Sequence, residues 1–274
     1  MVAVVTDSAA NVPDAVALEL GIAVVPLTVR FGEEVVRDGA DQDGFYERLR
    51  GGEVAATSAP SVGEWLEGFR AATAGDLVCV TLAAALSATH HEAVLAADRF
   101  EGRVEVVDSG NASMAEGFVA IEAARGARDG AAVEEVAARA RDVAGRVRLL
   151  GAIETFDYLR RTGRVTKLQA YAATALSIRP VFGLASGEIE PVGRPRTRSK
   201  ALDMIAGEVA SNADGGRVHI AALHALAEAD ARGLLDRVRG RVDVAEEFVV
   251  TATPVIGANA GPGLVGLAWW SEPS

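Results

Sequence analysis

The sequence predicts an α/β protein of two domains, an N-terminal parallel α/β layer and a C-terminal α+β domain with a mainly antiparallel sheet. Its 274 residues exceed the length of one average domain. Up to about residue 145, apolar runs of strand length alternate with helical segments, which is typical of a parallel sheet. Beyond that point two strands are separated only by Ser186 and Gly187, which indicates a hairpin. We therefore predict domains at residues 1–145 and 146–274.

The first half repeats a strand followed by a turn and a helix. The apolar run at residues 2–6 ends in Asp7-Ser8, and a helix is predicted from Pro13 up to Gly21. Residues 22–31 are predicted to form the second strand. The later strand RVEVVDSG also ends in Asp-Ser, so parallel pairing would bring both pairs to one sheet edge. Each pair also suits a simple helix cap.

Two loops of this half carry hydroxyl groups near a predicted helix start. Thr57 and Ser58 are expected in the loop before a helix that a Ser-x-x-Glu capping box begins. Ser87 and Thr89 lie at the turn after the buried strand DLVCVTLA. Ligands of open α/β sheets bind outside the carboxyl ends of the strands, so this turn is a candidate binding site.

The second half is predicted to mix hairpins with helices. A strand at residues 146–154 is followed by two short helices, TFDYLRRTG (155–163) and KLQAYAATAL (167–176). The hairpin comes next, followed by a helix, a strand and another helix. The chain is then expected to close with two apolar strands around the turn at Gly261–Gly263. This order predicts a largely antiparallel sheet.

The composition excludes several classes of protein. A net charge of −11 and a pI near 4.9 argue against a general nucleic-acid binder. The single cysteine, Cys79, cannot build a disulfide framework. No apolar run approaches the roughly 20 residues that span a bilayer, and the N-terminus does not read as a signal peptide. We predict a soluble, cytoplasmic protein without stable membrane insertion.

The segment Tyr158–Lys200 is a basic stretch in this acidic chain. It holds nine Lys or Arg residues against Glu188 and Glu190. Such a stretch is often only a solvated basic face, but Arg164 and Arg196 lie beside glycine or proline in turn contexts. That placement favours a rigid anion clamp.

Motifs for catalysis and for metal binding are missing from the sequence. There is no CxxC, HExxH, GxSxG or phosphate-binding GxxxxGK[ST] pattern. His219 alternates with apolar neighbours, which favours a satisfied core residue. We therefore predict no catalytic residue, no metal and no cofactor, and favour the binding of an anion over the cleavage of a bond.

A series of short motifs resembles the DegV family over nearly the whole chain. In order, they are VTDSAANVPD, GIAVVPLTVRFG, ATSAPS, ALSATH, VVDSGNAS, YLRRTGRV, LSIRPVF, GEIEPVGRPRTR and NAGPG. The resemblance implies a two-domain protein that holds one long-chain fatty acid in a cleft between the domains. It also implies, for some members, a role as the lipid-binding subunit of bacterial fatty acid kinase, whose catalytic subunit phosphorylates the bound carboxylate.

The resemblance also implies roles for individual residues. Thr57 and Ser87 would donate hydrogen bonds to the carboxylate, where charge-assisted bonds are strong. Arg164 and Arg196 would neutralise the carboxylate and the incoming phosphate and engage the kinase. Asn259 stands where the family usually has histidine before its Gly-Pro-Gly turn, so it would donate a hydrogen bond without carrying a charge.

Three functions are consistent with these observations. The first is a fatty-acid-binding protein that presents the lipid carboxylate to a partner kinase. The second is a lipid carrier of the same fold without a kinase partner, which Asn259 favours. The third is an acyl hydrolase using Ser87 with His90 or His91, although no carboxylate is placed in the sequence to orient either histidine.

Overall fold

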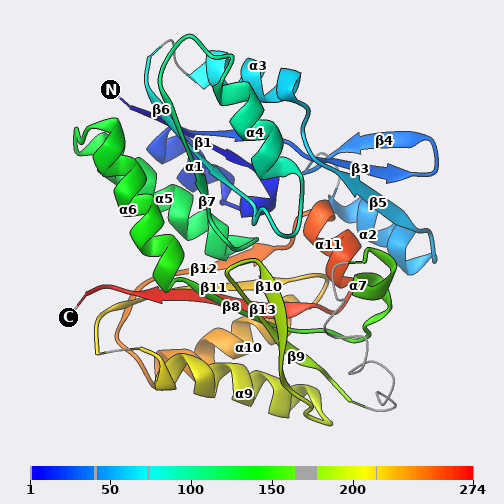
Figure 1. The fold of residues 1–274 in the computed structure, drawn as a ribbon. Coiled ribbons are helices and arrows are strands. Elements are labelled where there is room, and N and C mark those ends of the chain that lie inside the picture. Colours follow the sequence, from blue (N-terminus) through cyan, green and yellow to red (C-terminus); the bar gives the residue numbers. More distant parts are fainter. Residues whose placement is uncertain (1, 40–41, 73–74, 164–177, 214, 274) are drawn as a thin grey trace.

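The structure is a computed structural model that describes residues 2–39, 42–72, 75–163, 178–213 and 215–273. The two larger of the three β-sheets in this part of the chain alternate with three layers of helices, so that each of these two sheets has helices on both faces (Figure 1). The outer helices on one side are α3 (Val62–Ala72) and α4 (Thr89–Ala97), those between the sheets are α5 (Met114–Arg128) and α6 (Val133–Arg146), and those on the other side are α9 (Arg198–Ser211) and α10 (Glu228–Arg239). The predicted α/β fold class is confirmed.

The first sheet is parallel and has four strands. In spatial order they are β2 (Ile22–Val25), β1 (Ala3–Asp7), β6 (Leu77–Thr81) and β7 (Val104–Asp108). β6 is buried along its whole length, as expected of a strand covered on both faces. β1 and β7 both flank β6 in parallel, so Asp7 and Asp108 lie at the same carboxyl edge, as predicted.

The predicted single strand at residues 22–31 is wrong, because the chain leaves the parallel sheet at Pro26. Proline has no N–H for a ladder bond, and the strand breaks there. The remainder forms a separate antiparallel sheet of β4 (Glu34–Arg37), β3 (Thr28–Phe31) and β5 (Ala55–Ser58). Thr57 and Ser58 therefore lie on β5 and pair with β3, and their predicted position in a loop is wrong.

The second sheet has six strands and is antiparallel except for one pair. In spatial order they are β10 (Glu188–Gly193), β9 (Val181–Ala185), β8 (Arg148–Ala152), β13 (Val265–Ser271), β11 (Val218–His224) and β12 (Val244–Thr251). The hairpin between β9 and β10 is confirmed. Its turn residues Ser186 and Gly187 have φ angles of 50° and 76°, which suit a two-residue hairpin loop.

The close of the chain differs from the prediction of two strands around a turn. Helix α11 (Pro254–Ala260) lies between β12 and β13. Pro254 occupies the start of this helix, where its fixed φ is favourable and its missing N–H costs nothing. Asn259 consequently lies on a helix. The division of the chain into domains at residue 145 stays a prediction.

The shorter helices complete the fold around these sheets. They are the 3-10 turn η1 (Ser8–Ala10), α1 (Asp14–Leu20), α2 (Gln42–Arg50) and α7 (Asp157–Arg161). The helix predicted at residues 167–176 lies outside the described residues. No helix among those described is both long and apolar enough to cross a membrane.

Helix α5 is the central helix of the structure. Thirteen of its fifteen residues are buried, including the charged Glu116 and Glu122. Gly117 allows the close approach of η1, since a Cβ at this position would lie 2.6 Å from the carbonyl oxygen of Ala10. This contact packs the turn that follows β1 closely against α5.

Candidate functional site

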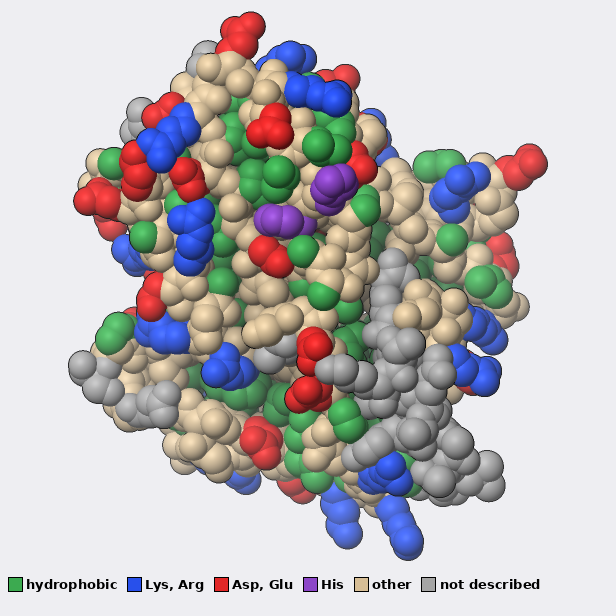
Figure 2. Space-filling view, in the orientation of Figure 1, with side chains coloured by type: hydrophobic (Ala, Val, Ile, Leu, Met, Phe, Trp, Pro, Cys, Tyr) green, Lys and Arg blue, Asp and Glu red, His purple; other side chains and the backbone are tan. Residues whose placement is uncertain are grey.

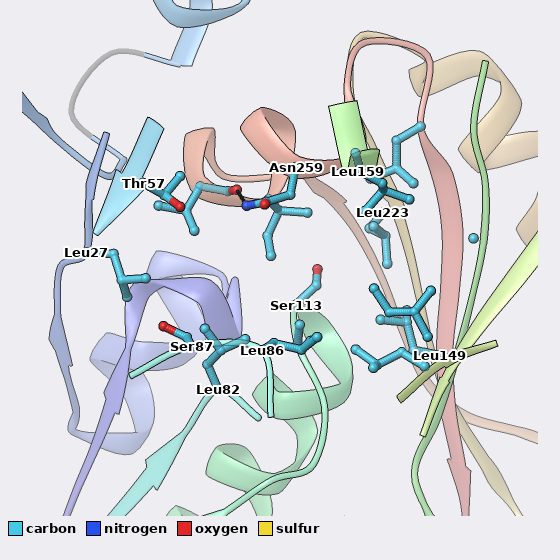
Figure 3. Close-up of a pocket in the computed structure, with 18 of the residues that line it drawn as sticks. Leu27, Thr57, Leu82, Leu86, Ser87, Ser113, Leu149, Leu159, Leu223 and Asn259 are labelled. Carbon is cyan, nitrogen blue, oxygen red and sulfur yellow. Dashed lines mark hydrogen bonds between the residues drawn. The ribbon is translucent and has the colours of Figure 1, made fainter. Parts of the chain in front are cut away.

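A cavity with about 870 Å³ of empty space, its mouth included, lies between the carboxyl edge of the parallel sheet and one face of the second sheet (Figure 3). Its lining comes from both predicted domains: Leu27, Thr57, Ser58, Ala59, Leu82, Leu86, Ser87, Ala112 and Ser113 from the first, and Leu149, Leu150, Gly151, Leu159, Phe182, Leu184, Ile189, Leu223, Val255, Ile256, Asn259, Ala260 and Leu264 from the second.

The wall of the cavity is mostly aliphatic. Leucines from the second sheet and from the loop after β6 supply much of it, and Leu149 and Leu223 lie at the end away from Thr57 and Ser87 in Figure 3. None of the described lining residues is charged. Such a wall favours a long apolar ligand, because each buried methylene group contributes about 0.8 kcal/mol.

The loop after β6 is held in place by the two aspartates at the sheet edge. The Leu82 N–H donates to Asp7 Oδ2 at 2.9 Å, and the Ala84 N–H donates to Asp108 Oδ1 at 3.2 Å. Asp7 also accepts the Ala9 N–H, so it caps η1 as well. The Asp-Ser pairs seen in the sequence therefore position the loop that carries Ser87.

Ser87 lines the cavity and is hydrogen-bonded to Thr89. Their hydroxyl oxygens are 2.8 Å apart, and the Thr89 N–H donates to Ser87 Oγ at 3.3 Å. Thr89 is fully buried at the start of α4 and is not among the lining residues. Thr89 therefore contacts Ser87, which lines the cavity, but does not line the cavity itself.

Thr57 and Ser58 line the cavity from β5. The register pairs Thr28 with Ser58 and Val29 with Thr57. The Ser58 hydroxyl contacts that of Thr28. Figure 3 shows Thr57 and Ser87 toward the same end of the cavity, on opposite walls. The structure therefore brings the predicted hydroxyl residues 57, 58 and 87 to one cavity.

Asn259 lines the cavity from α11. Its Nδ2 donates to the Val255 carbonyl oxygen at 2.8 Å, while Oδ1 is buried without a hydrogen-bond partner. Asp38 fixes the start of this helix, since its Oδ1 accepts the Val255 N–H at 2.9 Å and its Oδ2 accepts the Ser8 hydroxyl at 2.7 Å. Burial raises the pKa of Asp38, and these two hydrogen bonds oppose that rise.

Only one of the two predicted arginines falls among the described residues. Arg164 lies outside the described residues. Arg196 is exposed in the loop before α9 and is not part of the cavity wall. Other arginines of the basic stretch pair with acids, among them Arg179 with Glu154 and Arg198 with Asp230. Basic and acidic side chains are accordingly interspersed on the face shown in Figure 2.

Neither histidine proposed for a hydrolase contacts Ser87 among the described hydrogen bonds. His90 Nδ1 is 2.9 Å from the hydroxyl of Thr81, and His91 is exposed. The hydroxyl of Ser87 is instead paired with that of Thr89. No described base is hydrogen-bonded to Ser87, so the geometry gives the hydrolase hypothesis no support.

A second cluster of chemistry-bearing side chains lies between α5 and the second sheet. Glu122, His219 and Glu246 could each offer one ligand atom to a metal. Arg125 and Arg139 already pair with Glu122, both at 2.6 Å, and Arg125 also pairs with Glu246 at 2.8 Å. These guanidinium groups neutralise the carboxylates. The cluster is an ion-pair network, and His219 is a satisfied core residue, as predicted.

Two buried carboxyl groups lie beneath the loop that carries Ser87. Burial raises the pKa of Asp7 to about 6, although the N–H groups of Leu82 and Ala9 lower it. Burial and the nearby Asp7 hold the pKa of Glu116 well above its usual range. Glu116 Oε2 has no donor facing it, while Oε1 accepts from the Thr6 hydroxyl at 3.4 Å. Glu116 is therefore the protonated member of the pair.

Sequence reasoning missed Ser113 and most of the leucine wall. Ser113 follows β7 and begins α5, and its hydroxyl points into the cavity in Figure 3. Because Ser113 closely follows a strand that ends in Asp-Ser, the sequence could have placed it at the same sheet edge. Leu149 and Leu223 carried no such signal, because an inward-facing leucine that lines a cavity has the same sequence pattern as one that packs in the core.

The sequence matches a model of the DegV family, described as a family of uncharacterised proteins, over residues 1–272. A DegV domain-containing protein of Streptomyces coelicolor is 38% identical over 272 residues, which cover 97% of each chain. Another, from Halalkalibacterium halodurans, is 32% identical over 99% of each chain.

Solved structures of this family have the same fold. A DegV family protein from Thermus thermophilus, described by its fatty acid binding, superposes with a TM-score of 0.93 at 29% identity over 99% of each chain. DegV of Bacillus subtilis, described as a fatty acid binding protein, superposes with a TM-score of 0.88 at 27% identity over 99% of each chain.

Proposed function

The chain belongs to the DegV family, and on that premise we propose that it binds one long-chain fatty acid in the cavity described above. The observation that carries this proposal is the shape and chemistry of the cavity: an aliphatic wall with a few hydroxyl and amide groups and no charged side chain among the described lining residues. A tail of fifteen methylene groups would contribute about 12 kcal/mol before ordering costs. The tail therefore sets the affinity.

The carboxylate lies in this proposal at the end marked by Thr57 and Ser87. The Ser87 hydroxyl can donate to an anion while its oxygen accepts from Thr89, and the Thr57 hydroxyl supplies a second donor. A charged acceptor makes such bonds about twice as strong. Thr89 supports Ser87 through the bond between their hydroxyl groups, and the Ser58 hydroxyl, next to Thr57 in the sequence, contacts Thr28. Asn259 uses one N–H on the Val255 carbonyl oxygen and has a second to donate.

We further propose that the bound carboxylate is presented to the catalytic subunit of a fatty acid kinase. Arg164 and Arg196 would then stabilise the transferred phosphate, and the exposed position of Arg196 suits contact with a partner. The alternative is a lipid carrier without a kinase partner. The uncharged Asn259 and the absence of an arginine from the described cavity wall favour that alternative.

Extraction and mass spectrometry of lipid from the gently purified protein test the binding proposal. We expect one saturated or unsaturated fatty acid per chain, and delipidated protein should bind palmitic acid again. A protein that carries no lipid and fails to take up palmitic acid after delipidation would contradict the proposed function.

A phosphorylation assay separates the two forms of the proposal. With ATP and the catalytic subunit of a bacterial fatty acid kinase, the presenting form yields acyl phosphate. Arg196→Ala should then lower the rate about 1,000-fold or more, as for arginines that contact a transferred phosphoryl group. The carrier form gives no acyl phosphate although the lipid stays bound. Arg217→Ala, an exposed arginine at the opposite end of the second sheet, is the matched control.

A further inference from the structure

Ser113 places a single hydroxyl group in the aliphatic part of the cavity. It precedes α5 in the segment after β7, the residue is only 1% exposed, and Figure 3 shows its oxygen pointing into the open middle of the cavity. The methylene groups of an acyl tail gain nothing from a hydroxyl group at this point. The presence of a hydroxyl group at this point of the cavity therefore needs another explanation.

The hydrogen bonds that Ser113 makes within the protein leave its Oγ able to accept a hydrogen bond from a ligand in the cavity. Asn11 Nδ2 donates to the Thr251 carbonyl oxygen at 3.0 Å, which fixes the orientation of that amide. Its Oδ1 therefore faces Ser113 and accepts from the Ser113 hydroxyl at 3.3 Å. Because the only hydroxyl hydrogen is used in this bond, the lone pairs of Ser113 Oγ remain for a donor.

The backbone of Ser113 is held in a conformation that favours glycine. Its φ is 52° and its ψ is −149°. A serine in such a region is strained, and residues held in this way cluster at ligand sites. Its N–H donates to the Ala9 carbonyl oxygen at 2.8 Å, which helps to hold the strained turn. Glycine would adopt the turn without strain but would remove the hydroxyl group.

We propose that Ser113 accepts a hydrogen bond from a hydroxyl group carried part-way along the acyl chain, so that the cavity favours hydroxylated long-chain fatty acids. The proposal rests on the proposed function and names its ligand class more closely. In a wall of leucines an unpaired hydroxyl on the ligand would be penalised, and Ser113 supplies the partner that removes this penalty.

Competition binding tests the proposal with stearic acid and a series of stearic acids that carry one hydroxyl group at successive mid-chain carbons. Each competes with a fluorescent fatty acid on the delipidated full chain. We expect one positional isomer to bind the wild type at least as tightly as stearic acid. In Ser113→Ala and in Ser113→Gly, that isomer should weaken about tenfold relative to stearic acid.

The two variants separate selectivity from strain. Ser113→Gly relieves the backbone and should unfold at a higher temperature than Ser113→Ala, while both lose the preference. Ile256→Ala, which enlarges the cavity without touching a polar group, should weaken stearic acid and its hydroxylated isomers alike. If stearic acid binds but no isomer shows a preference that depends on Ser113, the inference is overturned. If stearic acid itself does not bind, the proposed function fails instead.

Discussion

Replacing Leu86 with tryptophan is expected to weaken the binding of palmitic acid about 100-fold. Leu86 is half-buried in the loop after β6 and points toward the middle of the cavity (Figure 3). An indole group there would occupy the space of about four methylene groups of the ligand. At about 0.8 kcal/mol for each, the loss is roughly 3 kcal/mol, which corresponds to about two powers of ten in the dissociation constant.

Isothermal titration of the delipidated protein with palmitic acid measures this effect. Leu18→Trp is the matched control, since Leu18 is 86% exposed on α1 and does not line the cavity. That variant should bind as the wild type does. Wild-type affinity in Leu86→Trp would mean that the acyl chain lies elsewhere, whereas lost affinity in both variants would point to a general effect of the added tryptophan.

The parts of the site that the sequence predicted share a local cause. Strands that end in Asp-Ser beside a parallel neighbour bring their side chains to one edge whatever the rest of the chain does. For that reason the position of Asp7 and of the turn at Ser87 could be predicted from periodicity alone. Family resemblance added Thr57 and Asn259, which the structure brings to the same cavity.

The errors concern positions where distant contacts decide the local structure. Thr57 and Ser58 have no strand pattern of their own, and pairing with β3 makes them a strand. The helix at Pro254–Ala260 was mistaken for a strand because its apolar residues show no clear period, and the Asp38 carboxylate that holds its first turn comes from far along the chain. The sequence around Pro254 does not indicate that Asp38 will bind the start of this helix.

Glu116→Gln is expected to make the protein more stable at neutral pH and to flatten the dependence of its stability on pH. Glu116 and Asp7 both have folded-state pKa values above their usual ones, to about 6 for Asp7 and well above the usual range for Glu116. The stability that such groups contribute is present below their unfolded pKa values and is lost as the pH rises through the folded values. The wild type should therefore lose unfolding free energy from about pH 4 upward, by about 3 kcal/mol through Asp7 alone.

Urea denaturation at a series of pH values measures the effect of the substitution. A glutamine keeps the shape of the protonated acid, accepts from Thr6 and donates to Asp7 without taking up a proton on folding. Its advantage over the wild type should grow by about 1.4 kcal/mol per pH unit above pH 4.5, up to the folded pKa of Glu116. Glu101→Gln, at an exposed position, should keep the wild-type profile. A Glu116→Gln profile parallel to that of the wild type would show that Glu116 is ionised in the folded protein. In that event Asp7 and Glu116, the two carboxyl groups beneath the loop that carries Ser87, would both be ionised at neutral pH, and no proton would bridge them.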